Sequence, residues 1–294
     1  MAQVLINEDT LKNIADAIRG INGLSKRFKP SEMAAAIEQE ACIPFKCISD
    51  ITVYTKETCP YDVVDFTRYN VTLIRDYFCY RSVSTSSDYV GCGSGMNSYI
   101  ANRLIFPHAV KVGGWAFYKT HLGGIEIPVA TELGKSAFCG SQGFETIEIP
   151  KVKLLGSFSL SETSLKKIII PDGVEYAPTG LFNDNFDLEY VVYGKNIKTL
   201  YNHYGSSDSR KFTKIKALYF RGETPPGFSG SGSNLPLGSS SSKLKYNICV
   251  PIGSVSAYQT AFNSYSSSAD WTFIEMHPND MPHYDEYGHA VWNN

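Results

Sequence analysis

A short phrase returns at a nearly fixed interval along this chain. It has the form Leu-x-x-Ile-x-Ile followed by a proline, and its clearest copies end at Pro128, Pro150 and Pro171, with a looser copy ending at Pro107. Successive prolines lie 21, 22 and 21 residues apart. A period of this length is typical of a solenoid, in which each repeat forms one coil and buries its apolar face only against neighbouring coils. We therefore expect a stack of coils and not a catalytic domain.

The residues three and one before each proline are apolar in every copy. A strand places residues two apart on one face, so both should point into the coil. The position between them, which should point outward, holds Ile105, Glu126, Glu148 and Ile169. Proline should end each strand because it has no N–H to donate. We predict adjacent parallel strands whose buried residues are Ile125, Ile127, Ile147, Ile149, Ile168 and Ile170.

A second signature follows each proline. Six residues on stands a glycine (Gly113, Gly134, Gly156), and ten residues on stands a large apolar residue (Phe117, Phe138, Leu160). We expect the glycines to form tight turns and the large residues to fill the interior of each coil. Residues 71–80 carry a similar pattern with Phe78 as the filling residue, so they should belong to an early coil.

Later copies are less regular. Gly194 and Arg221 stand where proline is expected before the series closes at Pro251, and the intervals lengthen to 23, 27 and 30 residues. Lengthening intervals indicate loops inserted on one face of the stack. Residues 254–262 have the cap and spacing of a short helix, and residues 271–276 suit a strand, which predicts a terminal cap for the solenoid.

The chain thus divides into four segments. Residues 1–40 form a helical module for attachment or oligomerisation, residues 41–100 hold irregular first coils and a Ser/Gly-rich insertion, residues 101–251 form the solenoid, and residues 252–294 form the capping helix, strand and tail. The expected fold class is mainly β: a leucine-rich-repeat-like solenoid of short parallel strands with a small N-terminal α-helical module and a C-terminal cap. The helices of the module are too short to form a core alone. Their apolar stripe is the candidate assembly surface, made of Leu11, Ile14, Ile18, Met33 and Ile37.

Charge and composition exclude several classes of protein. A net charge of −2 and a pI near 6.3 argue against a nucleic-acid binder with a basic surface. No run approaches the ~18 apolar residues of a membrane span, and the first residues lack the pattern of a signal peptide. The seven cysteines include no Cys-x-x-Cys pair. Free thiols are therefore expected, with a Cys42–Cys47 disulfide as the alternative.

No constellation of catalytic residues stands out. His277, His283 and His289 share the tail with acidic residues, so a metal clamp is conceivable. A polar tail that docks on a neighbour through Tyr284, Tyr287 and Trp292 is favoured. Glu126 and Glu148 should lie side by side on the sheet, about 4.8 Å apart. We interpret them as a solvated face and not as an acid/base pair. We expect no enzyme activity, metal or cofactor.

Two parts of the chain resemble known families. The phrase I-x-I-P with G-x-x-A-F, and the ending YFRGETPP followed by ICVPIGSVSAYQTAF, resemble BspA-type leucine-rich repeats over residues 71–276. The segment LKNIADAIRGINGLSKRFKPSEMAAAIEQ resembles a short helical module at the front of tail and fibre proteins of phages that infect Gram-positive bacteria. Together the resemblances imply a virion component, assembled in the host cytoplasm and displayed on the particle, whose partners are other virion proteins and further copies of itself.

Tyrosine is the one enriched chemical type, with 19 residues. Its flat apolar ring and single hydroxyl suit both glycan stacking and protein contact, whereas packing at the repeat edges is an equally weighted alternative. Residues 82–98 and 227–242 form Ser/Gly-rich loops that are free of core constraints. The candidate recognition surface beside them comprises Tyr89, Tyr99, Tyr118, Tyr204 and Phe228.

These observations favour a non-enzymatic phage structural protein. We expect a tail or fibre-associated adhesin that contacts a glycan or protein on the host surface, without nucleic-acid or membrane partners. A bacterial BspA-like surface adhesin is one alternative, and a purely decorative or head-fibre virion protein is another. An enzyme such as a glycan depolymerase is the third alternative, and it would need a carboxylate pair in a groove that the sequence does not indicate.

Overall fold

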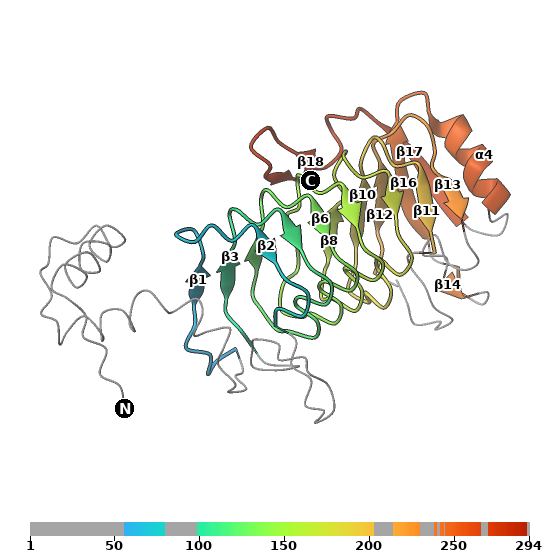
Figure 1. Ribbon diagram of the computed structural model, residues 1–294. Coiled ribbons are helices and arrows are strands. Elements are labelled where there is room, and N and C mark those ends of the chain that lie inside the picture. Colours follow the sequence, from blue (N-terminus) through green and yellow to red (C-terminus); the bar gives the residue numbers. More distant parts are fainter. Residues whose placement is uncertain are drawn as a thin grey trace, which may run out of the picture.

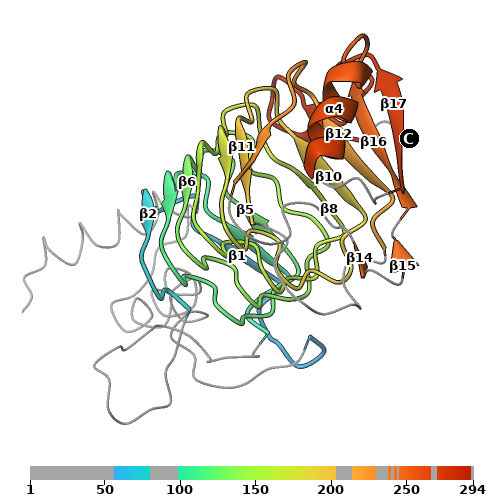
Figure 2. The ribbon, with the colours of Figure 1, turned by 90° about the vertical axis from the view of Figure 1, so that its right-hand side faces the viewer.

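The chain forms a parallel β-solenoid in which similar coils stack along one axis (Figures 1 and 2). The computed structural model describes residues 56–79, 99–202, 214–229, 238–239, 242–243, 245–265 and 270–292. The predicted N-terminal helical module with its assembly surface, and the Cys42–Cys47 alternative, lie outside the described residues. Within those residues, no helix has the length and apolar character needed to cross a bilayer.

The strands that precede the proline positions build the first ribbon of the solenoid. Its first sheet has the order β1-β3-β5 and its second β17-β16-β12-β10-β8, and every pairing within them is parallel. The strands are β1 (Val63–Asp65), β3 (Arg103–Ile105), β5 (Ile125–Glu126), β8 (Lys167–Ile169), β10 (Tyr190–Tyr193), β12 (Ala217–Phe220), β16 (Lys245–Pro251) and β17 (Asp270–Met276).

Shorter strands that follow the proline positions build the second ribbon. It consists of the parallel sheets β2-β4-β6-β7 and β13-β11-β9. The strands are β2 (Leu73–Ile74), β4 (Lys111–Val112), β6 (Glu132–Leu133), β7 (Leu154–Leu155), β9 (Tyr176–Ala177), β11 (Thr199–Tyr201) and β13 (Gly227–Ser229). A small antiparallel pair, β14 (Gly238–Ser239) and β15 (Ser242–Lys243), lies apart from both ribbons.

The register of the first ribbon confirms the prediction of a parallel solenoid. Leu104 pairs with Ile125, and Ile168 pairs with Val191, so equivalent positions of successive repeats lie side by side. The copy around Ile147 joins β5 only through a parallel bridge between Glu126 and Glu148. The two glutamates are therefore neighbours, as predicted, but the ladder is interrupted between this copy and β8.

The predicted core residues all point into the stack. Ile125, Ile127, Ile147, Ile149, Ile168, Ile170, Phe117, Phe138 and Leu160 are all buried. Phe117 and Phe138 stack with their ring centroids 5.1 Å apart. The filling residue of the first coil is off by one from the prediction. The Cys79 N–H donates to the Ala116 carbonyl as the Phe117 N–H donates to Ala137, so Cys79 and not Phe78 is the equivalent position.

The glycines that follow each proline by six residues are required by close backbone contact, and not by the tight turns that the sequence predicts. A Cβ on Gly134 would lie 2.5 Å from the Gly114 nitrogen, and a Cβ on Gly156 would lie 2.4 Å from the Gly134 carbonyl carbon. Backbones of successive coils approach too closely here for any side chain. The left-handed turn falls two residues later, where Trp115 and Phe158 have φ of 52° and 60°.

The two departures from proline have their own roles. A Cβ on Gly194 would lie 2.5 Å from the Pro171 carbonyl oxygen, so only glycine fits there. Arg221 is 9% exposed, and its guanidinium lies 2.9 Å from a carboxylate oxygen of Asp172. The later coils therefore keep the register although their sequences lose the proline.

A helix and a strand follow the last proline, close to the positions expected. Helix α4 (Val255–Tyr265) packs the buried rings of Tyr258 and Phe262 onto the end of the core. The Phe262 ring lies 5.3 Å from Trp271 of β17, the last strand of its sheet. That this unit protects the open end of the stack stays a prediction.

Candidate functional site

After β17 the chain returns across the outer face of the first ribbon and forms the hairpin β18 (His283–Tyr284) and β19 (Ala290–Val291) (Figure 1). This return corrects the expectation that Ile169 faces solvent. Ile169, Val192 and Cys249 occupy outward positions on the ribbon, yet each is at most 3% exposed. They lie outside the main core cluster, so they form a second apolar layer beneath the tail. Met281 of the tail is fully buried.

The hydroxyl of Tyr284 is inserted into the backbone ladder of the first ribbon. In the other coils the equivalent hydrogen bonds are direct: the Phe106 N–H donates to the Glu126 carbonyl at 2.9 Å. At the interruption, the Ile149 N–H donates to the Tyr284 hydroxyl at 3.0 Å, and that hydroxyl donates to the Ile169 carbonyl at 3.1 Å. Tyr284 thus replaces one ladder bond by two. Its burial raises the pKa of the phenol well above its ordinary range.

Further contacts fix the hairpin on the sheet. The Ala290 N–H donates to Glu148 at 3.2 Å, and the His289 Nδ1 lies 3.7 Å from the other Glu148 oxygen. The Trp292 ring lies 4.9 Å beneath the Lys167 ammonium. Asp285 accepts hydrogen bonds from backbone N–H groups of the hairpin turn, above all that of His289, and these bonds lower the pKa of its carboxyl. The tail therefore docks on its own solenoid, through Tyr284 and Trp292.

A metal clamp in this tail finds no support in the geometry. The described residues hold no group of three His, Cys, Asp or Glu side chains close enough to share an ion. His283 instead lies 2.9 Å from the Met281 carbonyl, and His289 faces Glu148. The cysteines among the described residues, Cys59, Cys79, Cys139 and Cys249, form no disulfide.

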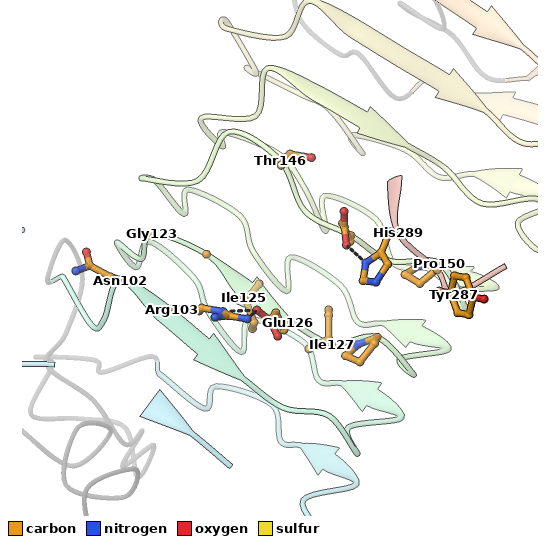
Figure 3. A pocket seen from close by; sticks show the side chains of 14 residues that line it. Asn102, Arg103, Gly123, Ile125, Glu126, Ile127, Thr146, Pro150, Tyr287 and His289 are labelled. Atoms are coloured by element: carbon orange, nitrogen blue, oxygen red, sulfur yellow. Dashed lines mark hydrogen bonds and ion pairs between the residues drawn. The ribbon is translucent and has the colours of Figure 1, made fainter. Parts of the chain in front are cut away.

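A groove of about 560 Å³ lies between the hairpin turn and the first ribbon (Figure 3). Its floor comes from β3, β5 and the strand-like copy around Glu148, and its rim comes from Pro128, Pro150 and the turn at Tyr287. Tyr287 is 78% exposed. The groove therefore exists only where three coils and the returning tail come together.

Charged side chains line the floor of the groove. The Arg103 guanidinium forms an ion pair with Glu126, and the two side chains are 54% and 43% exposed. Glu148 lies beside Glu126 in register and faces His289. Each carboxylate thus has a partner and remains reachable from solvent. The two glutamates therefore form the solvated face expected from the sequence, and they offer hydrogen-bond acceptors to a ligand.

Gly124 leaves the hollow in the floor. It directly precedes β5, and its carbonyl accepts a hydrogen bond from the Leu104 N–H. Continuing the β3–β5 register by one residue sets Gly124 beside Arg103, at an outward position where the ribbon would otherwise carry a side chain. A Cβ on Gly124 would meet only the Asn102 carbonyl oxygen, at 3.9 Å, whereas a Cβ on Gly123 would lie 2.4 Å from that oxygen. Gly124 is therefore dispensable for the fold but decisive for the shape of the groove. Sequence reasoning missed it, although its place in the repeat indicates an outward position.

The predicted recognition surface needs correction. Tyr99 is 6% exposed, and its hydroxyl donates to Asn102 at 2.7 Å. Phe228 packs on Phe262 of α4 with ring centroids 5.2 Å apart. Tyr118 is half-buried beside the Lys119 ammonium, whereas Tyr89 and Tyr204 lie outside the described residues. Packing at coil edges explains Tyr99 and Phe228 better than ligand contact does.

A second, shallower hollow of about 390 Å³ lies on the second ribbon. Leu154, Tyr176 and Tyr201 line it, and Leu154 is 63% exposed. This hollow is mainly apolar and lacks the ion-paired floor of the first.

The fold and the repeat register define a leucine-rich-repeat solenoid. Residues 98–218 match the family described as BspA type leucine rich repeat region, in six copies. No curated protein matches the chain.

Solved structures include two repeat proteins with which the chain aligns. The crystal structure of the pneumococcal vaccine antigen PcpA aligns at 12% identity and a TM-score of 0.34, over 62% of this chain and 58% of that protein. The chain thus spans less than two thirds of that structure. A leucine-rich repeat protein from Bacteroides ovatus aligns at 12% identity and a TM-score of 0.14, over 70% of this chain and 93% of that protein.

Proposed function

We propose that the chain is a non-enzymatic adhesin of a phage virion, associated with the tail or a fibre, and that it contacts the host surface through the groove beneath the C-terminal hairpin. The observation that carries the proposal is the groove itself: a solvent-open site of about 560 Å³ whose polar floor is held on rigid strands. Binding sites of this size take small ligands or segments of larger ones. A repeat scaffold supplies such surfaces without catalytic machinery.

The virion location is supported by the N-terminal segment alone. Residues 11–39 resemble the attachment module of phage tail and fibre proteins, and their apolar stripe needs a partner to cover it. In this proposal residues 1–40 bind other virion proteins or further copies of the chain, and the solenoid projects from the particle surface. Several copies on one particle would raise the avidity of a weak site.

The test compares two substitutions of equal bulk. Gly124→Leu fills the groove at a position where the fold has room. Ala257→Leu adds the same side chain at an exposed position of α4, at the far end of the solenoid (Figure 1). We expect Gly124→Leu to reduce adsorption of the phage to host cells at least tenfold. Ala257→Leu should adsorb as the unmodified phage does, and both variants should unfold at the same urea concentration.

Removal of residues 1–40 provides the second arm of this test. The solenoid should stay folded, because the described coils stack only on one another, but the protein should be missing from purified particles. Normal adsorption by Gly124→Leu phage would contradict the adhesin role. A decorative role would then be favoured by the exposed apolar hollow at Leu154 and Tyr176, which suits contact with another virion protein.

A further inference from the structure

We propose that the groove recognises a neutral, hydroxyl-rich glycan segment and discriminates against acidic sugars. This inference rests on the proposed function, because it names the class of ligand for the same groove. It is carried by three features of the site: a pre-formed ion pair on the floor, an additional carboxylate beside it, and an aromatic ring on the rim.

The ion pair of Arg103 and Glu126 sets the type of hydrogen bonding that the floor offers. The pair has no net charge, yet it presents N–H donors and carboxylate acceptors side by side, and both groups are about half-exposed. A sugar hydroxyl both donates and accepts, so two neighbouring hydroxyls can bond to the carboxylate and the guanidinium together. Since the strands hold both side chains in place, little conformational entropy is lost on binding.

Glu148 gives the floor an excess of negative charge. It lies next to Glu126 in register, so two carboxylates and one guanidinium face the groove together with the His289 imidazole, whose neutral form leaves this excess in place. A ligand carboxylate or phosphate would meet repulsion in a partly desolvated space, where charges interact more strongly than in water. The same charges do not penalise an uncharged polyol. The electrostatics therefore select against acidic sugars and leave neutral ones free to bind.

The rim and the hollow supply apolar contact and space. Tyr287 is 78% exposed on the hairpin turn and lies beside Pro150 at the rim of the groove (Figure 3). Pro128 also lines the groove. One face of a pyranose ring is apolar and packs well on such surfaces. The missing side chain at Gly124 leaves room on the floor for the hydroxyl-bearing edge of the sugar.

Saturation-transfer NMR on the full chain tests the inference with matched sugar pairs. The probes are glucose with glucuronic acid, galactose with galacturonic acid, and mannose with mannuronic acid. We expect at least one neutral sugar to bind in the millimolar range and every acidic sugar to bind at least tenfold more weakly. Gly124→Leu should abolish the signal, Tyr287→Ala should weaken binding at least fivefold, and Ala257→Leu should leave it unchanged.

Three results would overturn the inference. No neutral sugar gives a saturation-transfer signal, an acidic sugar binds as strongly as its neutral partner, or the Gly124→Leu variant still gives the signal. Its failure is distinguishable from failure of the adhesin role. If Gly124→Leu abolishes phage adsorption but no neutral sugar binds, the groove is an adhesin site for another ligand. If a neutral sugar binds but adsorption is unaffected, the ligand class stands and the adhesin role falls.

Discussion

Glycine has two opposite uses in this solenoid. At Gly134 the backbone of the next coil lies so close that a Cβ would approach the Gly114 nitrogen to 2.5 Å, so the coils can stack only without a side chain. At Gly124 a Cβ would have 3.9 Å to its nearest neighbour, and the missing side chain shapes the surface instead. The first glycine serves packing and the second serves the groove, although both stand at fixed places in the repeat.

We expect Gly134→Ala to lower the free energy of unfolding by about 1–3 kcal/mol, because the added methyl group forces two coil backbones apart. Gly124→Ala is the matched control and should change it by less than about 0.5 kcal/mol, as surface substitutions usually do. Urea unfolding followed by circular dichroism measures both. Equal destabilisation of the two variants would refute the close-approach explanation.

The nine core residues could be predicted from the sequence because burial in a stack repeats with the coil. Ile147 and Phe138 were identified by spacing alone, and the structure buries both. Tyr99 and Phe228 could not be assigned in this way, because an amphipathic ring fits a coil edge as well as a binding surface. Gly124 was missed because a glycine next to another glycine indicates a turn more readily than an open floor.

At the scale of the element, the hairpin β18–β19 connects two sheets that would otherwise be separate. Its anchor is one hydroxyl between the Ile149 N–H and the Ile169 carbonyl. The sequence predicts that the tail docks on a neighbour through Tyr284, Tyr287 and Trp292, but it does not indicate the position. The prediction is wrong for Tyr287, whose side chain is 78% exposed. Contacts between residues 135 positions apart leave no periodic signal in a single sequence.

Tyr284→Phe should lower the free energy of unfolding by about 1–3 kcal/mol, because the buried Ile149 N–H loses its partner while the ring is kept. Tyr287→Phe removes the same hydroxyl from an exposed ring of the same hairpin, so it should have no measurable effect. Chemical denaturation of the two variants checks this. A loss no larger for Tyr284→Phe than for Tyr287→Phe would show that the inserted hydroxyl contributes nothing.

The raised pKa of Tyr284 gives this contact a pH dependence. In the unfolded chain the phenol loses its proton above about pH 10, whereas burial keeps it protonated in the folded protein. The unfolded state then binds fewer protons, so the free energy of unfolding falls as the pH rises above 10. This fall should be shallower in Tyr284→Phe, as measured by urea unfolding at about pH 9 and pH 11. The buried Tyr258 phenol and the Cys249 thiol, whose pKa values are also raised by burial, should contribute to the slope that remains in both proteins.

For the whole molecule, stability depends on neighbouring coils. The sheets of both ribbons pair consecutive coils, so a defect in one coil removes the surface on which the next one packs. The parallel fold could be predicted from the sequence because a regular repeat of 21–22 residues implies similar coils that stack on one another. The return of the tail across the first ribbon could not, since it follows no repeat.

Ile147→Asp should therefore disrupt more than its own coil, because a buried carboxylate without a partner costs several kcal/mol. Hydrogen exchange should show lost protection in the coils on either side. Thr146→Asp places the same carboxylate at the preceding, exposed position and should leave protection near that of the unmodified protein. Loss confined to the coil of Ile147 would contradict nearest-neighbour stacking.

The insertion of Tyr284 also has a consequence for the order of events during synthesis. Each coil can form as soon as its neighbour has left the ribosome, because its contacts lie about one repeat away. The gap between Ile149 and Ile169 cannot be bridged until residue 284 has emerged, more than a hundred residues later. The hairpin that forms one wall of the groove arrives with it. A nascent chain therefore carries the coils of the groove floor for a long interval before it can bind anything in the groove.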